Sequence, residues 1–342
     1  MFRKYSLLSL SCLLVILLTA IPSASENTIH TFKITAEEAH HGWLESTIPP
    51  VLTINDGDTV IFNTLTLFEG NVRSDMTFEE LMAARDALMA RSNTVYALTG
   101  PFYITGAEPG DVLEIRINRI VPAAWGATWI YPDHMGLGGL SDGSGNFEEG
   151  WFRSFYFCED RKTVEFMPGV TLQLAPIVGT MALAPRPGER YHPAPPNYFG
   201  GNMDNRELVA GTTLFIPVNV PGALFMAGDG HAVQGDGEVS ISALEAALDE
   251  VELQFIVRRD MTLNLPIAET PTHWITMGFH QDLNEAMRIA IRETIDFLSN
   301  NKGMTREEAF ALSSMAVDFR VTQVVNGSKG IHGMIPKSIF TE

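Results

Sequence analysis

Two short glycine-rich segments in the middle of the chain carry the side chains best suited to chemistry. Residues 200–205 read GGNMDN, and residues 228–238 read GDGHAVQGDGE. Together they supply an amide, a histidine and four acids: Asn202, Asp204, Asp229, His231, Asp236 and Glu238. Glycine permits the backbone conformations and close approach that let such side chains converge. The two segments therefore predict a binding or catalytic site.

The spacing in the second segment suggests a hairpin. Asp229 and His231 are two positions apart, so on an extended strand they share one face. Asp236 and Glu238 have the same spacing, and a turn over residues 232–235 would set His231 opposite Asp236 and Asp229 opposite Glu238. Cross-strand neighbours lie roughly 5 Å apart. Oxygen and imidazole ligands suit zinc or a similar divalent ion, whereas solvated acids in an ordinary turn are the plain alternative.

The elements that must position these residues are mostly strands. Alternating apolar and polar residues predict strands within 28–72, after the turn at 108–111, and at 239–244, 251–258, 272–277 and 319–325. Helices are predicted at 77–91, 282–299 and 305–317, where Thr77 with Glu80 and Thr305 with Glu308 have capping-box spacing. Residues 122–150 read as a long loop. We expect a mainly β fold, β-sandwich-like, with a C-terminal pair of α-helices.

The N-terminus resembles a secretory signal. Arg3 and Lys4 precede an apolar stretch from Leu7 to Ile21, and small residues follow before Glu26. We expect a signal peptide at 1–25, a single domain at 26–342, and a secreted or periplasmic protein with no membrane span after cleavage, because a span needs about 20 apolar residues.

Charge and cysteine content narrow the function classes. The chain has 23 basic and 41 acidic residues. Because Arg3 and Lys4 leave with the signal, 21 basic residues remain and the net charge becomes −20. Such an acidic protein is not expected to bind nucleic acid or anionic membranes. Cys158, in an aromatic run, is expected to be buried and inert.

Longer stretches resemble a known family. Beyond the two glycine-rich segments, the blocks HHGW at 40–43, GPFYITGAEPGDVLEI at 100–115 and KGIHG at 329–333 are similar to the acetamidase/formamidase family. The resemblance covers nearly all of residues 30–336. It implies hydrolysis of short aliphatic amides to ammonia and carboxylate, a homo-oligomer, and a site role for His40, which matches a family pattern of His, any residue, Gly and an aromatic.

Amide hydrolysis suggests roles for these residues. We expect Asp204, Asp229 and His231 to bind a divalent metal that activates water, with zinc as the first choice and calcium as the alternative. Glu238 is the expected general base, and Asp236 and Asn202 complete the catalytic set, with Asn202 orienting the substrate amide. Glycine and alanine around the site favour a small substrate.

Other interpretations remain open at this stage. The fold could serve an exported, non-catalytic protein whose hairpin holds a structural ion, or Cys158 could be the nucleophile of a thiol amidase. If the hairpin is only a turn, the site must be sought at His40, Glu108 or His134. Near the chain end, His332 is expected to be exposed.

Overall fold

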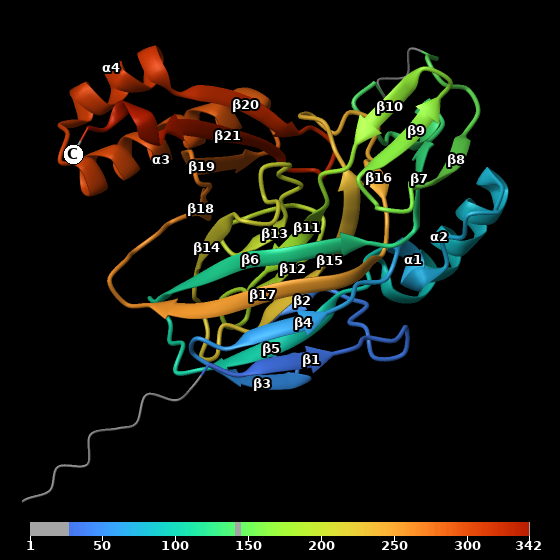
Figure 1. Cartoon of the computed structure of the whole chain (residues 1–342), viewed down its shortest axis with the longest axis horizontal. Coiled ribbons are helices and arrows are strands. Elements are labelled where there is room, and N and C mark those ends of the chain that lie inside the picture. The colour runs from blue at the N-terminus through green and yellow to red at the C-terminus, as the bar shows by residue number, and fades with distance from the viewer. Residues whose placement is uncertain (1–26, 141–144, 342) are drawn as a thin grey trace, which may run out of the picture.

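The computed structural model describes residues 27–140 and 145–341, and it consists mainly of strands (Figure 1). The signal peptide predicted for residues 1–25 lies outside the described residues. Within the described ranges, no helix is both long enough and apolar enough to cross a membrane.

Two large sheets form the body of the protein. The larger sheet runs in the order β1 (Ile29–Phe32), β4 (Thr59–Phe62), β17 (Leu248–Arg258), β6 (Val112–Pro122), β14 (Thr213–Pro217), β18 (Ile267–Glu269), β19 (His273–His280), β21 (Lys329–Pro336) and β20 (Asp318–Gln323). The second sheet runs in the order β13 (Gly200–Asn202), β11 (Ile177–Ala182), β15 (Phe225–Val233), β16 (Leu244–Glu245), β7 (Trp125–Ile130) and β8 (Trp151–Tyr156). Next to it, β5 (Thr99–Thr105) pairs with β15, and β3 (Leu52–Asn55) pairs with β5.

The main core lies between these sheets. Phe102 of β5 packs its ring edge against Phe62 of β4, with ring centroids 5.6 Å apart, and Phe225 of β15 packs against Phe255 of β17 at 4.9 Å. Along β17 every second side chain from Val251 onward is buried, as one face of a half-buried strand requires. The predicted β-sandwich is confirmed.

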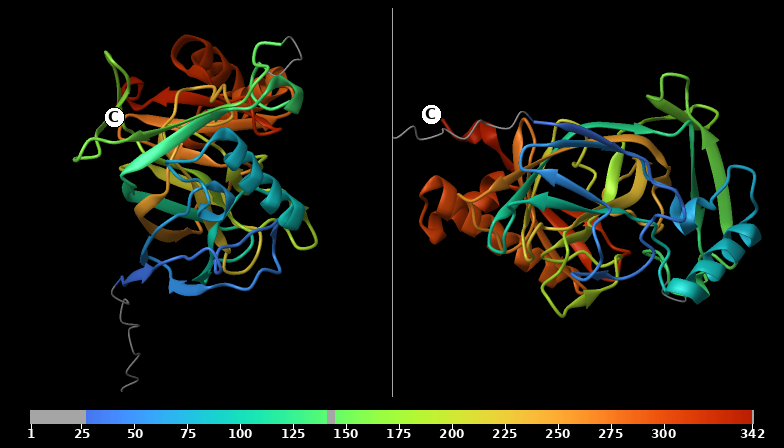
Figure 2. Two further views of the ribbon diagram at one scale, coloured as in Figure 1. Left: turned by 90° about the vertical axis from the view of Figure 1, so that its right-hand side faces the viewer. Right: turned by 90° about the horizontal axis from the view of Figure 1, so that it is seen from below.

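Smaller elements surround this body. The remaining strands form two ribbons, β9 (Thr163–Met167) with β10 (Val170–Gln173) and β2 (Leu44–Glu45) with β12 (Arg190–Tyr191). The helical elements are α1 (Leu67–Gly70), α2 (Phe78–Ser92), η1 (Asp133–Met135), α3 (Leu283–Lys302), α4 (Arg306–Ala316) and η2 (Lys337–Ile339). The pair α3 and α4 lies at one end of the molecule and α2 at the other (Figure 1, Figure 2).

The longer helices begin where the sequence predicts. Thr77 caps α2 and Thr305 caps α4, and in both cases the glutamate three residues later reaches back to the capping residue. Helix α3 lies directly on β19, because a Cβ on Gly278 would come within 2.4 Å of backbone atoms of the helix. The predicted C-terminal helices are confirmed.

Two local predictions are wrong. Residues 122–150 are not a structureless loop, because β7 lies within them and pairs along its whole length with β8. The strand predicted at 239–244 is reduced to β16, since the preceding residues form turns. On its other side β7 pairs with β16, where Ala127 lies opposite Glu245 from much later in the chain.

Candidate functional site

Strand β15 carries Asp229 and His231 on one face, as their spacing predicts. The predicted hairpin between residues 229 and 238 is wrong. The strand pairs with β11, β5 and β16, and His231 lies opposite Glu245 rather than Asp236. Residues 234–243 form a loop instead of a second strand, and Asp236 is exposed in it. Glu245 of β16, opposite His231, therefore comes from later in the chain than a tight turn would bring it.

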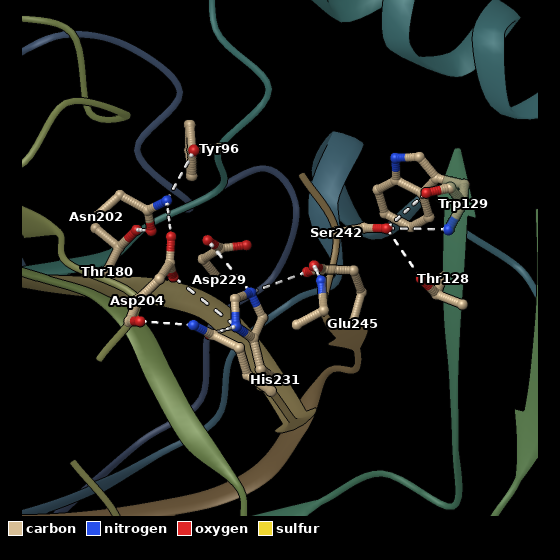
Figure 3. A network of polar contacts seen from close by, with 12 residues as sticks. Tyr96, Thr128, Trp129, Thr180, Asn202, Asp204, Asp229, His231, Ser242 and Glu245 are labelled. Atoms are coloured by element: carbon tan, nitrogen blue, oxygen red, sulfur yellow. Dashed lines mark hydrogen bonds and ion pairs between the residues drawn. The ribbon is translucent and has the colours of Figure 1, made fainter. Parts of the chain in front are cut away.

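Five buried acidic and imidazole side chains converge beside β15. Ligand-type atoms of Asp204, Asp229 and His231 lie within 4.8 Å of one another, and so do those of His231, Glu238 and Glu245. The Nε2 atom of His231 lies 3.6 Å from Asp229 Oδ2 and 3.3 Å from Glu245 Oε2. Figure 3 shows Asp204, Asp229 and Glu245 around the imidazole ring of His231. His231 is therefore shared by two candidate ligand groups.

The backbone is strained at three of the acids. Asp204, Asp229 and Glu238 have φ angles of 45°, 59° and 43°, in the left-handed region that residues with a Cβ rarely adopt. Such conformations cost about 1–3 kcal/mol each and concentrate at functional sites. Their presence at three members of one cluster indicates that the surrounding structure holds the carboxylates in place.

A glycine on the neighbouring strand makes room for the carboxylates. A Cβ on Gly179 of β11 would lie 2.3 Å from Asp204 Oδ1 and 2.9 Å from the Asp229 carbonyl oxygen. Both distances are too short for a real side chain, so only glycine at this position allows the two acids to approach as they do.

The hydrogen bonds of Gln234 define the tautomer of His231. The Gln234 Nε2 donates to the carbonyl oxygen of Asp204 at 2.6 Å, so its Oε1 is the atom that faces His231. That oxygen lies 2.9 Å from His231 Nδ1, which must therefore donate. In a neutral ring Nε2 then carries the free lone pair, which is the arrangement a metal-binding histidine needs.

Asp204 is held by two amide side chains. Its Oδ2 accepts from Asn202 and from Asn326, at 2.6 Å in each case. The Asn202 amide also donates to Tyr96 Oη at 3.1 Å and accepts from Thr180 at 2.5 Å. Both N–H donors of Asn202 are thus used within the protein. In this structure Asn202 positions Asp204, rather than orienting a substrate amide as the sequence suggested.

Burial shifts the proton affinities of the cluster. Desolvation raises the pKa of Asp204 to about 6, with repulsion from Asp229 adding to it and attraction to His231 opposing it. Desolvation, followed by repulsion from Asp204, raises the pKa of Glu238 well above its usual range. Burial alone would lower the pKa of His231, but the carboxylates of Glu245 and Asp229 outweigh it and raise that pKa. Protons and a cation would therefore compete for these groups.

The donor set fits a divalent cation. Among the described residues, Asp204 Oδ1, Asp229 Oδ1, His231 Nε2 and Glu238 Oε2 are buried without a hydrogen-bond partner. Unpaired buried polar atoms are costly and rare, and here they belong to a group that could hold a metal ion. Carboxylate and imidazole are ligands that zinc accepts.

A cavity of about 320 Å³ borders the cluster. Asn202, Asp229, Glu238 and Glu245 line one part of its wall, and mostly apolar or aromatic side chains line the rest. A ligand in this cavity would thus meet the acids directly. Asp236 instead lines a neighbouring cavity of about 440 Å³, and Glu238 lines both cavities.

The other sequence candidates lie apart from the cluster. His40 is half-buried and its Nε2 contacts the Trp43 carbonyl oxygen at 3.1 Å. Glu108 and His134 are exposed, the former in a turn closed onto Asp111. Cys158 is exposed, so the expectation that it is buried is wrong.

His332 was expected to be exposed, yet it is fully buried in β21 and its Nδ1 lies 2.7 Å from Thr322 Oγ1. Burial lowers the pKa of His332 to about 3, with help from the positive charges of Arg320 and Arg206. Its place in the middle of a paired strand, rather than its nearness to the chain end, decides its exposure.

Several residues of the site were not found from the sequence. Glu245, Gln234, Tyr96 and Asn326 reach the cluster from a short strand and three loop or edge positions. Gln234 lies within the glycine-rich segment but is not itself a ligand-type residue, and the sequence around Glu245, Tyr96 and Asn326 has no second ligand-type residue at strand spacing. The contact of Ser242 with the backbone of Trp129, at 2.8 and 3.0 Å, fixes the segment that leads to Glu245.

Known proteins are similar to this chain in sequence and in fold. The model of the "Acetamidase/Formamidase family" matches residues 28–190 and 187–342. A formamidase candidate of Schizosaccharomyces pombe is 29% identical over 263 residues, and an acetamidase of Mycolicibacterium smegmatis is 24% identical over 262 residues. These matches span 60–61% of this chain and 61–62% of the two curated relatives.

Solved structures match more of the chain. The crystal structure of an acetamidase from Bacillus halodurans is 31% identical, with a TM-score of 0.80, over 90% of this chain and 98% of that one. The acetamidase from Yersinia enterocolitica is 25% identical, with a TM-score of 0.83, over 93% of this chain and 95% of that one. By its sequence match over nearly all described residues and by its fold, the chain belongs to the acetamidase/formamidase family.

Proposed function

We propose that the protein is an amidohydrolase that cleaves the C–N bond of linear carboxamides, such as formamide and acetamide, to ammonia and a carboxylate. The observation that carries the proposal is the buried cluster of Asp204, Asp229, His231 and Glu238, whose unpaired atoms lie beside a cavity. Family membership supports the reaction class, because the relatives bear the names formamidase and acetamidase.

Asp204, Asp229 and His231 would hold a divalent metal, with zinc as the first choice and calcium as the alternative. Such an ion, when bound, lowers the pKa of a water and polarises a carbonyl group. The protein supplies the arrangement around it: Gln234 presents the His231 lone pair, and Asn202 and Asn326 fix the Asp204 carboxylate.

Glu238 is the proposed proton carrier. It is buried and lines the cavity, and its pKa is raised by desolvation and by the neighbouring Asp204. A carboxyl group with a raised pKa can take a proton from water and deliver it to the departing nitrogen near neutral pH. Glu245 also lines this cavity and lies 3.3 Å from His231 Nε2.

The test combines metal analysis with turnover. The purified protein should contain a stoichiometric divalent ion and release ammonia from formamide or acetamide, and a chelator should remove both properties. His231→Ala should lose metal and activity together. Glu238→Gln should keep the metal and lose about 10²–10⁴-fold in rate, whereas Asp236→Asn, an exposed carboxylate in the adjoining loop, should change neither. Full activity of His231→Ala would refute the proposed site.

A second candidate is an exported, non-catalytic protein that uses the same cluster as a structural ion site. Stoichiometric metal, loss of stability on chelation and no ammonia from any amide would favour it. Export itself, with removal of residues 1–25, is part of both proposals, and so is a homo-oligomer. Mass spectrometry of the mature N-terminus tests the first, and light scattering tests the second.

A further inference from the structure

The cavity beside the acidic cluster is large for the amides considered so far. Its volume is about 320 Å³. An apolar cavity of about 150 Å³ is enough to bind benzene. Acetamide has only four non-hydrogen atoms, so it would leave most of this space unfilled. The expectation of a small, glycine- and alanine-lined site is therefore wrong for the cavity as a whole.

The cavity has two chemically different parts. The acids lie at one side, whereas Phe68 of α1, Met89 of α2 and Trp129 of β7 contribute apolar and aromatic surface. The rings of Phe68 and Trp129 lie with centroids 6.0 Å apart. In Figure 3 Trp129 lies beyond Glu245 as seen from Asp204. A ligand with one polar end and one apolar end would match this division.

Among the described residues, the one arginine in the wall of this cavity, Arg85, does not provide a binding site for a second polar group of the ligand. Arg85 also lines the cavity, but its guanidinium donates to Asp86 at 2.8 Å and lies 5.8 Å from the centre of the Tyr131 ring. Its charge is thus already paired. A substrate with an acidic acyl chain would in addition be repelled by the buried carboxylates that line the cavity.

We propose that the preferred substrate is a primary carboxamide whose acyl group is apolar and about as large as a benzene ring. This inference rests on the proposed amidohydrolase function and specifies its substrate class. The bond change is unaltered: water oxygen bonds to the carbonyl carbon, the C–N bond breaks, and the nitrogen leaves as ammonia with the transferred proton. The apolar group is desolvated among Phe68, Met89 and Trp129.

The test is a substrate series on the metal-loaded full-length protein, with ammonia release as the readout. From acetamide to butyramide, kcat/KM should rise about fourfold per added methylene, the factor expected for burying one. Benzamide should exceed acetamide by about tenfold or more. Faster hydrolysis of acetamide than of both larger amides would overturn the inference while leaving the amidohydrolase proposal intact.

A pair of variants on α2 tests the location of the acyl group. Met89→Trp should fill the apolar part, reducing kcat/KM for benzamide about tenfold or more while sparing acetamide. Ala90→Trp, on the exposed neighbouring position, should change neither substrate. Equal losses for both substrates in Met89→Trp would contradict the assignment. If no amide is hydrolysed, calorimetric titration still decides: benzamide should bind more tightly than acetamide, and equal or weaker binding would overturn the inference.

Discussion

Replacing Gln234 by leucine should weaken metal binding without touching any proposed ligand. In the parent protein Gln234 accepts from His231 Nδ1 at 2.9 Å and donates to the Asp204 carbonyl oxygen at 2.6 Å, and it is only 6% exposed. Leucine has a similar volume but can form neither hydrogen bond. The imidazole N–H and the carbonyl group would both lose their partner in a buried environment.

The magnitude follows from these two losses. A buried polar group left unpaired costs about 1–3 kcal/mol, so the free energy of unfolding should fall by about 2–6 kcal/mol. Loss of a group that orients a metal-binding histidine weakens metal affinity about 10–100-fold. Gln234→Glu should restore the acceptor for His231 but not the donor to Asp204. It should therefore recover metal affinity more than stability.

Three measurements check this reasoning. Zinc competition with a chromophoric chelator gives affinity, urea unfolding gives stability, and ¹⁵N NMR of the imidazole reports which nitrogen of His231 carries the proton. The matched control is Gln254→Leu, which removes a hydrogen bond to the Gly57 carbonyl oxygen away from the site, and should leave zinc affinity unchanged. Parental zinc affinity and an unchanged His231 tautomer in Gln234→Leu would refute the argument.

Three further predictions concern the room at Gly179, the pH dependence of metal affinity, and the effect of Glu293 on stability. Gly179→Ala would place a Cβ 2.3 Å from Asp204 Oδ1, so the Asp204 carboxylate should be displaced and metal content and turnover should fall together. Gly235→Ala, which has open space around its Cβ, should reduce neither. Metal affinity, followed by competition titration from pH 8 downward, should fall as pH falls toward the pKa of about 6 of Asp204, because protons then occupy the ligands; a pH-independent affinity would contradict this. Burial, with repulsion from Asp296, raises the pKa of Glu293 to about 7 in the folded state from 4.5. Between pH 4.5 and about 7 the folded state therefore binds more protons than the unfolded state. The contribution of Glu293 to the free energy of unfolding thus falls as pH rises through this range. Glu293→Gln should remove that decline in urea unfolding curves, and an unchanged pH profile would count against it.

The sequence predicts local features of this fold better than its long-range pairings. The capping residues Thr77 and Thr305 start their helices where expected, because capping depends on groups within one turn. Asp229 and His231 lie on one side of β15, as strand alternation predicts, although the left-handed φ angle of Asp229 was not predictable from the spacing. The pairing of His231 with Glu245 was missed, since the chain between them forms a loop whose path depends on contacts such as that of Ser242 with Trp129.

The same distinction explains which site residues were found. Asp204 and Glu238 lie in glycine-rich segments that draw attention by composition, but their φ angles near 45° result from the packing around them. Gln234 lies in the same segment as Glu238 but, like Asn326, is not a ligand-type residue. They acquire roles only because Asp204 lies beside both of them in the folded protein.

The hydrogen bond from Asn326 to Asp204 sets a time at which the site can be completed during synthesis. The two residues are separated by 122 positions in the chain. A growing polypeptide therefore contains the candidate ligands long before the residue that secures one of them. Domains generally fold as the chain emerges from its N-terminal end, yet the Asp204 carboxylate can gain its second amide partner only after another 122 residues have been synthesised. A chain that stops before Asn326 would consequently hold the Asp204 carboxylate through Asn202 alone.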